Sequence, residues 1–598
     1  MRKINTPRIL EEKPVSGGPA QAVFGSDALA GTLRALDIPF LALNPGASFR
    51  GLHDSLVNHL GNRRPQMLLT LHEESAVAIA HGYAKVSERM MGAVVHSNVG
   101  LMHASMAVFN AWCDRVPLLL LGATGPLDAA RRRPWIDWIH TSRDQGALVR
   151  DFTKWDDQPG SVAAAQESLL RAARIANTAP RGPTYVCLDV TLQESQIDAL
   201  PSLPDVARYR APESASPSAA LIEQAARILS RAKAPVILMG RVSRSESSWR
   251  NRIVLAERLR ARVLTDLKAG AAFPTDHALH AAPPGMVAPA ERALQILREA
   301  DVLLSLDWID VAGTLKHALG NAPVSAKVIQ ASPDAHSHRG WSMDYQGIVP
   351  SDLYCLCEPD ALVSALLAAP ALRKPASARR KIKPAASPAR RNAEPGLSIE
   401  SVARALDACL GERPCCLLRV PLGWNGAWRH FRHPLDYVGF DGGAGIGSGP
   451  GMAVGGALAL LGSERVPVAL MGDGDFLMGV TALWTAARYR IPLLIVVCNN
   501  RSFFNDELHQ ERVARVRGRP VENRWIGQRI ADPDIDLAAM GKAQGAEAFG
   551  PVTDAAQLQP ALAEALERVR AGSVCVVDVR VDPGYGSEMS GSLRPAPR

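Results

Sequence analysis

The feature of this sequence that most constrains its fold is a series of short, uniformly apolar runs separated by stretches with helical periodicity. Runs such as VPLLLLGATG, APVILMGR and IPLLIVVCNN recur in three blocks along the 598 residues. Because they lack polar alternation, strands made from them are buried on both faces, as in parallel sheets covered by helices. A chain of this length also exceeds what one hydrophobic core supports. We therefore predict an α/β fold of three doubly wound parallel-sheet domains in series.

Changes in composition mark the boundaries of these blocks. The connection between the first two blocks is rich in Pro and Ser, and a basic segment precedes the third. The predicted division is a tail at 1–24, domains at 25–195, 218–368 and 396–585, a linker at 369–395 and a second tail at 586–598.

The net charge of +8 comes from one segment of the chain. Residues 371–391 hold eight Lys and Arg residues and no acid, among Ala, Pro and Ser. This composition favours a solvated linker between domains over an arm that binds nucleic acid. We expect no nucleic-acid partner.

The sequence has no segment typical of membrane insertion or secretion. The basic N-terminal stretch lacks an apolar core, and no later stretch offers roughly eighteen uninterrupted apolar residues. The nine cysteines form no CxxC pair, which favours buried thiols in a reducing compartment. We expect a cytoplasmic protein with no membrane partner.

The most specific motif lies at the ends of two predicted strands. Gly472, Asp473 and Gly474 follow the run VPVALM, and after 24 residues Asn499 and Asn500 end the run IPLLIVVC. Carboxyl ends of neighbouring parallel strands meet at one edge of a sheet, where such folds bind ligands. A carboxylate and an amide there suit Mg²⁺, and the glycines allow backbone to approach phosphate. The alternative is a plain turn followed by an Asn pair.

A glycine-rich stretch, GGAGIGSGPGMAVGGALA, precedes this motif. It contains no strict GxGxxG, so a dinucleotide-binding loop is not favoured. A packing turn that buries the aliphatic side chain of Ile446 is the simple interpretation.

The text GDGDFLMGVTALWTAARYRIPLLIVVCNN resembles the diphosphate-binding domain of thiamine-diphosphate enzymes, in the benzoylformate decarboxylase and acetolactate synthase family. The resemblance implies a pyrimidine-binding, a central and a diphosphate-binding domain, with thiamine diphosphate and Mg²⁺ as cofactors. It assigns the metal to Asp473, Asn500 and the carbonyl of Ser502. It also places Gly472 and Gly474 at the cofactor, and Ile446 beneath its bent form.

A second match, HEESAVAIAHGYA, lies in the first block. Activation of the cofactor requires a buried acid with a raised pKa, and the resemblance gives this role to Glu73. Glu74 is then a charge in the first turn of a helix, which suits the helix dipole. An assignment shifted by one residue, to Glu74, stays open.

Two histidines stand where benzoylformate decarboxylase carries active-site histidines. His96 ends the run MGAVVH and has a side chain suited to proton transfer near neutral pH, although a structural histidine is the alternative. His277 lies in the segment FPTDHALH. Against this reading, Ala47 replaces the substrate-binding serine of that enzyme, and Ser48 follows one place later.

The resemblance implies decarboxylation of a 2-oxo acid through a C2 carbanion and an enamine. One alternative is an acetolactate-synthase-like carboligase, often with FAD in the central domain; GRVSRSESSWRN matches its glycine-rich loop poorly, so FAD is possible but not favoured. A non-catalytic cofactor-binding homologue is an alternative of another class. The family also implies a homodimer or homotetramer with active sites between subunits.

Overall fold

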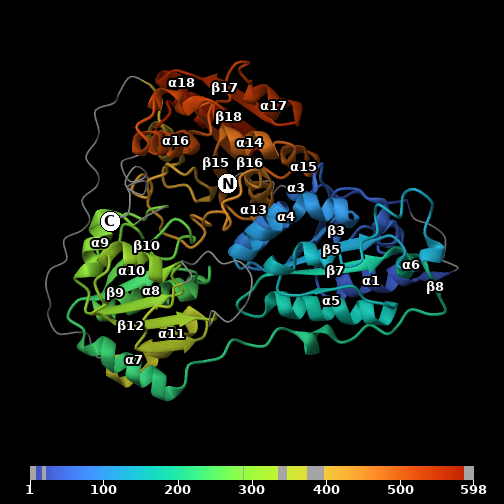
Figure 1. Ribbon diagram of the computed structural model, residues 1–598, viewed down its shortest axis with the longest axis horizontal. Helices are drawn as coiled ribbons and strands as arrows, with labels where there is room; N and C mark the ends of the chain where they lie inside the picture. The colour runs from blue at the N-terminus through green and yellow to red at the C-terminus, as the bar shows by residue number, and fades with distance from the viewer. Residues whose placement is uncertain (1–8, 16–21, 287–288, 335–346, 373–395, 585–598) are drawn as a thin grey trace, which may run out of the picture.

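The computed structural model describes residues 9–15, 22–286, 289–334, 347–372 and 396–584. Within them the chain forms three separate sheets whose neighbouring strands are all parallel, each covered by helices (Figure 1). The predicted α/β class with three doubly wound sheets is therefore confirmed. The domain boundaries stay predictions, and the basic segment at 373–395 lies outside the described residues.

The N-terminal domain has six strands in the order β3-β2-β4-β5-β7-β6, with helices on both faces. A two-stranded antiparallel pair, Val23–Phe24 with Gln196–Ile197, closes its outer end. The strands are β2 (Phe40–Leu43), β3 (Gln66–Leu69), β4 (Met91–Val94), β5 (Leu118–Thr124), β6 (Asp156–Asp157) and β7 (Pro183–Asp189); the helices are α1 (Gly25–Ala35), α2 (Arg50–Asp54), α3 (Glu73–Ser87), α4 (Ser97–Cys113), α5 (Val162–Asn177) and α6 (Val190–Glu194).

The central domain has five strands in the order β10-β9-β11-β12-β13. The strands are β9 (Pro235–Met239), β10 (Arg262–Thr265), β11 (Val302–Leu306), β12 (Lys327–Ser332) and β13 (Leu353–Leu356); the helices are α7 (Ala219–Arg231), α8 (Glu246–Leu259), α9 (Glu291–Arg298), α10 (Val311–Leu319) and α11 (Pro359–Ala368).

The C-terminal domain has five strands in the order β14-β15-β16-β18-β17, so the strands that end in the GDG and NN motifs are neighbours. The strands are β14 (Cys415–Arg419), β15 (Val466–Gly472), β16 (Leu493–Asn499), β17 (Glu547–Val552) and β18 (Val574–Arg580); the helices are α12 (Ile399–Leu410), α13 (Gly449–Ala459), α14 (Asp473–Gly479), α15 (Ala482–Tyr489), α16 (Phe504–Val516), α17 (Leu537–Ala543) and α18 (Ala555–Arg570).

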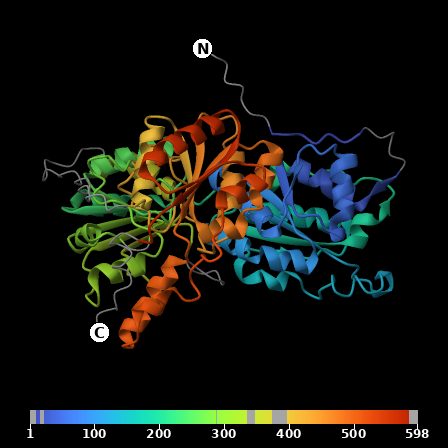
Figure 2. The same ribbon diagram turned by 90° about the horizontal axis from the view of Figure 1, so that it is seen from above.

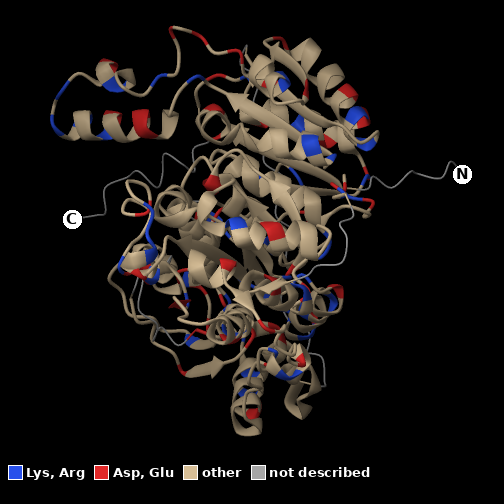
Figure 3. Ribbon diagram, turned by 90° about the vertical axis from the view of Figure 1, so that its right-hand side faces the viewer, with Lys and Arg blue, Asp and Glu red and all other residues tan. Residues whose placement is uncertain are grey.

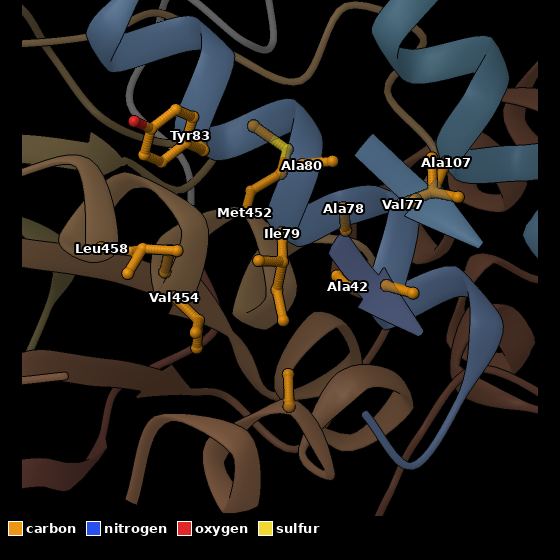
Figure 4. Packing of buried hydrophobic residues seen from close by; sticks show 14 of the residues in the cluster. Ala42, Val77, Ala78, Ile79, Ala80, Tyr83, Ala107, Met452, Val454 and Leu458 are labelled. Atoms are coloured by element: carbon orange, nitrogen blue, oxygen red, sulfur yellow. The ribbon is translucent and has the colours of Figure 1, made fainter. Parts of the chain in front are cut away.

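Helices α3 and α13 join the N-terminal and C-terminal domains. Ile79 on α3 and Met452, Val454 and Leu458 on α13 belong to one buried apolar cluster (Figure 4). Each such side chain contributes about 1.5–3 kcal/mol through burial. The helices approach so closely that a Cβ on Gly82 would collide with the backbone of Met452. This contact sets the N-terminal end of α3 beside the glycine-rich loop.

Several local features differ from the expectations. The apolar residues of the run LDYVGFDGG suggest a strand, but the run forms only an isolated bridge between Leu417 and Tyr437, and its φ angles are positive at Gly439 and Gly442. Residues 9–15, within the expected tail, pack against the body: the Leu10 N–H donates to the Tyr489 carbonyl. No helix of the described ranges is long and apolar enough to cross a membrane.

The segment after the NN motif forms an arm. Helix α16 and the 3₁₀ turn Val521–Trp525 contact each other and project from the body, in orange in Figure 2. Both acidic and basic residues lie along this arm, as the red and blue ribbon segments of Figure 3 show. The arm begins directly after Asn500, so its root belongs to the predicted metal site.

Candidate active site

The ends of β15 and β16 bring the predicted metal ligands together. Asp473 and Asn500 converge on one backbone group, because the Ser502 N–H donates to Asp473 Oδ2 at 3.1 Å and to Asn500 Oδ1 at 3.0 Å. Asp473 Oδ1 also accepts from the Gly474 N–H at 2.9 Å. Two side-chain oxygens of the type that Mg²⁺ prefers therefore lie at one sheet edge.

The environment of Asp473 fits a bound cation. Its side chain is buried, and burial raises the pKa of Asp473 to about 6 against the opposing effect of backbone N–H groups. Among the described residues, no Lys, Arg or His forms an ion pair with it. Beside it, a Cβ on Gly472 would meet no atom within 4 Å, so there is open space at this backbone. A buried oxygen ligand without a cationic partner, next to open space, suits a metal ion with an attached phosphate.

Glu507 fixes the third predicted ligand. Its carboxylate is buried and accepts a hydrogen bond from Ser502 Oγ at 2.5 Å. The composition of the segment around Asp506, Glu507 and His509 suggests a solvated, charged lid, but Glu507 is buried in the structure. Arg524 and Arg529 lie 3.5 Å from the two oxygens of the Glu507 carboxylate, which compensates the buried charge.

The glycine-rich loop is tied to the GDG motif by a carboxylate. Asp475 Oδ1 accepts from the N–H groups of Gly447 at 2.7 Å and Gly449 at 3.3 Å, and Arg419 Nε lies 2.5 Å from Asp475 Oδ2. Arg419 also contacts the buried Asp441 at 2.8 Å. This cluster holds the loop so that Ile446 keeps 37% of its surface exposed at the site.

Glu73 lies at the start of α3, where the His72 side chain caps the helix by accepting the Glu74 N–H at 3.2 Å. Glu73 is buried as expected, but the expected rise of its pKa was wrong for this structure. Burial raises the pKa of Glu73, yet hydrogen bonds from Asn44, from its own backbone and from His103 outweigh burial and hold the pKa below its usual value. The side chain is therefore ionised at neutral pH.

Glu74 links the two domains. Ser448 Oγ donates to Glu74 Oε1 at 2.8 Å, and Asn110 on α4 donates to Ser448 Oγ at 3.1 Å. Burial raises the pKa of Glu74, and the nearby charge of Asp475 adds to the rise. The ends of α3 and α13 thus meet within one chain. The expectation that active sites lie between subunits concerns an assembly of chains and stays a prediction.

His96 forms a polar cluster at the end of β4. His96 Nδ1 lies 2.9 Å from Ser48 Oγ, and its ring packs edge-to-face on His140, with centroids 4.7 Å apart. Burial lowers the pKa of His96, the charge of His140 lowers it further, and Glu73 opposes both. His96 is therefore within electrostatic range of Glu73. Ser48 supplies the hydroxyl group that the side chain of Ala47 lacks.

His277 has a different environment. Its Nε2 lies 3.2 Å from Glu257 Oε1, its Nδ1 accepts the Leu279 N–H, and its ring packs on Phe273. All these partners belong to the central domain. The structure brings Glu73 and His96 into one cluster, and Ile446, Gly472, Asp473, Gly474, Asn500 and Ser502 into a second, joined to the first through Glu74 and Ser448. It does not bring His277 to either.

Sequence reasoning missed several polar residues of the site. Asn44 precedes the PGAS segment in which Ala47 and Ser48 were compared, so that motif could have indicated it. His103 and His140 have no local signal, because each reaches the site from a segment far from its partner along the chain. Asp475 could have been found from the sequence, because it directly follows the GDG motif. Nothing in the sequence near Arg419 indicates that it pairs with Asp475.

The candidate site lies at the edge of a doubly wound sheet, near the contact between two α/β domains. Three models of one family match the chain: "Thiamine pyrophosphate enzyme, N-terminal TPP binding domain" at residues 24–148, the central domain at 222–345 and the C-terminal TPP binding domain at 423–579. The chain belongs to the thiamine pyrophosphate enzyme family.

The curated proteins that this chain resembles include decarboxylases and acetolactate synthases. Benzoylformate decarboxylase of Pseudomonas aeruginosa is 25% identical over 533 residues, covering 86% of this chain and 92% of that protein. A probable acetolactate synthase large subunit of Methanocaldococcus jannaschii is 24% identical over 499 residues, covering 80% of each. The family is thus clear, while the reaction within it is not assigned by identity at this level.

Solved structures agree on the fold. Benzoylformate decarboxylase from Polynucleobacter necessarius superposes with a TM-score of 0.76, and the 4-hydroxybenzoylformate decarboxylase of Rhodococcus jostii with 0.75. Both are 20% identical, and each superposition covers 94% of this chain and 99% of the other.

Proposed function

We propose that this enzyme decarboxylates a 2-oxo acid with thiamine diphosphate and Mg²⁺. The observation that carries the proposal is the cluster of Glu73, His96 and Ser48 on the same domain face that meets the glycine-rich loop. Such a cluster offers an ionised carboxylate and a titratable imidazole within one site. These are the groups that a decarboxylase needs for moving protons.

The two clusters would have different roles: one would bind the metal and the diphosphate, and the other would transfer protons. Asp473, Asn500 and the Ser502 carbonyl would hold Mg²⁺, and Gly472 and Gly474 would leave room for the diphosphate. Bound there, the cofactor supplies the electron sink that decarboxylation requires. Ile446, exposed on its loop, would contact the cofactor from below.

Glu73 and His96 would handle protons. Glu73 would hydrogen-bond the ring nitrogen of the cofactor through its carboxylate. His96, held by Ser48 and within electrostatic range of Glu73, would deliver a proton to the product carbon. His277 remains a predicted catalytic residue, but its contacts do not place it beside Glu73 or His96.

A carboligase of the acetolactate synthase type is the second candidate. The similarity to acetolactate synthase large subunits supports it. It would attach the same decarboxylated unit to a second carbonyl compound in place of a proton. The His96 cluster supports the decarboxylase, because an imidazole at the site can deliver a proton to the product carbon, whereas a carboligase needs a proton only on the oxygen of the second carbonyl compound.

The test is release of carbon dioxide from a panel of 2-oxo acids, including pyruvate and benzoylformate, with both cofactors present and products identified. We expect an aldehyde product, lost in Glu73→Gln. An acetohydroxy acid from pyruvate would establish the carboligase, and no turnover with any acid would contradict both. The assembly into dimers or tetramers and the cytoplasmic location stay predictions that this assay leaves aside.

A further inference from the structure

The chain enters the glycine-rich loop through a segment that lies against the central domain. Residues 434–441, the entry segment, precede the loop, which begins at Gly442. The Tyr437 hydroxyl donates to the Leu267 carbonyl at 2.7 Å, and the Tyr437 carbonyl accepts from the Ala271 N–H at 2.8 Å. Leu267 and Ala271 belong to the central domain, so hydrogen bonds to a second domain hold the entry segment.

A guanidinium group of the central domain holds the same segment. Arg244 Nη1 donates to the Pro434 carbonyl at 3.1 Å, and Nη2 donates to the Val438 carbonyl at 2.9 Å. Nη1 also lies 3.4 Å from the Tyr437 carbonyl. A Cβ on Gly270 would lie 2.6 Å from Nη1, so the glycine leaves the room that the guanidinium fills. The planar fork of donors lets Arg, unlike Lys, bind several carbonyls at once.

Arg244 also reaches the N-terminal domain, since its Nε donates to the Lys85 carbonyl on α3 at 2.6 Å. The Lys85 ammonium group in turn donates to the Phe440 carbonyl of the entry segment and lies 2.5 Å from the carboxylate of Asp114. The Lys85 side chain is 6% exposed within a single chain, and assembly of chains can only bury it further. Three domains therefore meet at the entry segment, and Arg244 joins all three.

The glycine-rich loop needs support at both ends. Its backbone lies partly in the left-handed region, with φ of +37° at Gly442, +55° at Ala444 and +104° at Gly447. A non-glycine residue such as Ala444 keeps a positive φ where the surrounding contacts enforce it. Asp475 holds the far end of the loop by accepting the Gly447 N–H at 2.7 Å. The entry segment holds the near end, so the place of Ile446 depends on both anchors.

We propose that Arg244 is a positioning residue of the active site, which fixes the glycine-rich loop to the central domain and so sets the place of Ile446. The segment GRVSRSESSWRN, a poor match to a flavin-binding loop, supplies this anchor. The inference rests on the proposed function, in which Ile446 contacts the cofactor. The hydrogen bonds of the anchor form within one chain, so they do not depend on how chains assemble.

Calorimetric titration in the presence of Mg²⁺ compares two probes, thiamine diphosphate and inorganic diphosphate. Both use the metal edge, but only thiamine diphosphate has rings for Ile446 to contact. In Arg244→Met, affinity for thiamine diphosphate should fall by about tenfold and turnover by about 100-fold, because the loop is displaced. Affinity for inorganic diphosphate should stay within about twofold of wild type. Arg244→Lys should lose nearly as much, since an ammonium group cannot replace the fork.

The matched control is Arg258→Met. Arg258 is also a partly buried arginine of the central domain, and its Nη1 donates to the Leu367 carbonyl of the same domain at 2.8 Å. Both affinities should stay at wild-type values. Tyr437→Phe removes one hydroxyl and keeps the buried ring, so it tests the same anchor if Arg244→Met does not fold. Its affinity for thiamine diphosphate should fall by about threefold.

A second readout needs no cofactor. Isoleucine-methyl NMR of the cofactor-free protein, with Ile446→Leu assigning the signal, should show the Ile446 signal moved in Arg244→Met and unmoved in Arg258→Met. A change that only lowered overall stability would leave this signal in place.

The outcomes separate the anchor from the proposed function. An unmoved Ile446 signal with wild-type affinities in the Arg244 variants would overturn the role of Arg244. Equal losses of affinity for the two probes would also overturn it, because they would show a general loss of order in the domain. Failure of the wild-type protein to bind thiamine diphosphate would overturn the proposed function, while the Ile446 signal would still decide whether Arg244 anchors the loop.

Discussion

Two buried carboxylates define the two halves of the site, and their surroundings are opposite. Asp473 is held by backbone N–H groups, and burial raises its pKa to about 6. Glu73 is held by the side chains of Asn44 and His103 as well as by its own backbone, and its pKa is lowered although it is also buried. Backbone N–H donors orient a carboxylate but carry no full charge. An adjacent histidine can carry a full positive charge. Asp473 is thus prepared for an added cation, while Glu73 already has its partner within the chain.

The largest expected effect tests which carboxylate binds the metal ion and which one activates the cofactor. Asp473→Asn removes the charge that balances Mg²⁺, so affinity for Mg²⁺ and thiamine diphosphate should fall by about 100-fold or more. Glu73→Gln should keep that affinity within about tenfold while losing turnover. Isothermal titration calorimetry measures the affinity of both variants for Mg²⁺ and thiamine diphosphate. Equal losses of affinity would contradict the division between the two carboxylates.

The next effect concerns the proton donor on the Glu73 side. His96→Asn keeps a polar contact with Ser48 but cannot donate a proton near neutral pH, so aldehyde formation should slow by about 100-fold. The measurement is kcat for the best 2-oxo acid of the panel. Ser48→Ala should slow the same step less, because it only loosens His96. Unchanged kcat in His96→Asn would remove the main argument for a decarboxylase.

The raised pKa of Asp473 makes a prediction about stability. A carboxyl whose pKa is raised by folding binds more protons when folded, so the metal-free protein should lose stability as pH rises from about 4 to about 6. The loss should be up to about 3 kcal/mol, since one pKa unit is worth about 1.4 kcal/mol. Mg²⁺ should therefore raise the melting temperature more at pH 7 than at pH 5.

The control for this prediction is Asp473→Asn measured without metal. Burial also raises the pKa of Asp441 to about 6, so that group titrates in the same window. Only the difference between wild type and Asp473→Asn reports Asp473. A difference that does not depend on pH would contradict the raised pKa.

A smaller effect is expected at the root of the arm. Glu507→Gln weakens the hydrogen bond that fixes Ser502, whose carbonyl is a proposed ligand, so Mg²⁺ affinity should fall by about tenfold. The same calorimetric titration measures it, and Glu511→Gln, on the same helix but bonded to Arg515 and Arg524, is the matched control. An equal loss of Mg²⁺ affinity in both variants would mean that the affinity depends on the arm as a whole and not on the contact between Glu507 and Ser502.

The smallest effect is expected at His277. Its contacts lie within the central domain, so His277→Asn should change kcat/KM by less than about twofold. A loss as large as that of His96→Asn would show that the functional assembly brings His277 to the site from elsewhere.

The sequence by itself determined the three parallel sheets and the edge at which the two side chains predicted to bind a metal meet. Uniformly apolar runs specify buried parallel strands, and the residues at strand ends share an edge once the strands are neighbours. The convergence of Asp473 and Asn500 could therefore be predicted from backbone direction, whereas the place of Ser502 came from the resemblance to known enzymes. The position of Glu73 at a helix start was equally local, and a resemblance to known enzymes supplied its role.

The tertiary structure alone decided the charge state of Glu73, the second partner of His96 and the burial of Glu507. Each depends on side chains from distant segments: Asn44 and His103 at Glu73, His140 at His96, and Arg524 and Arg529 at Glu507. The pKa of a buried group is a balance between desolvation and a few short contacts, and a change of one contact can reverse its sign. No local pattern in the sequence encodes which distant side chain will make that contact.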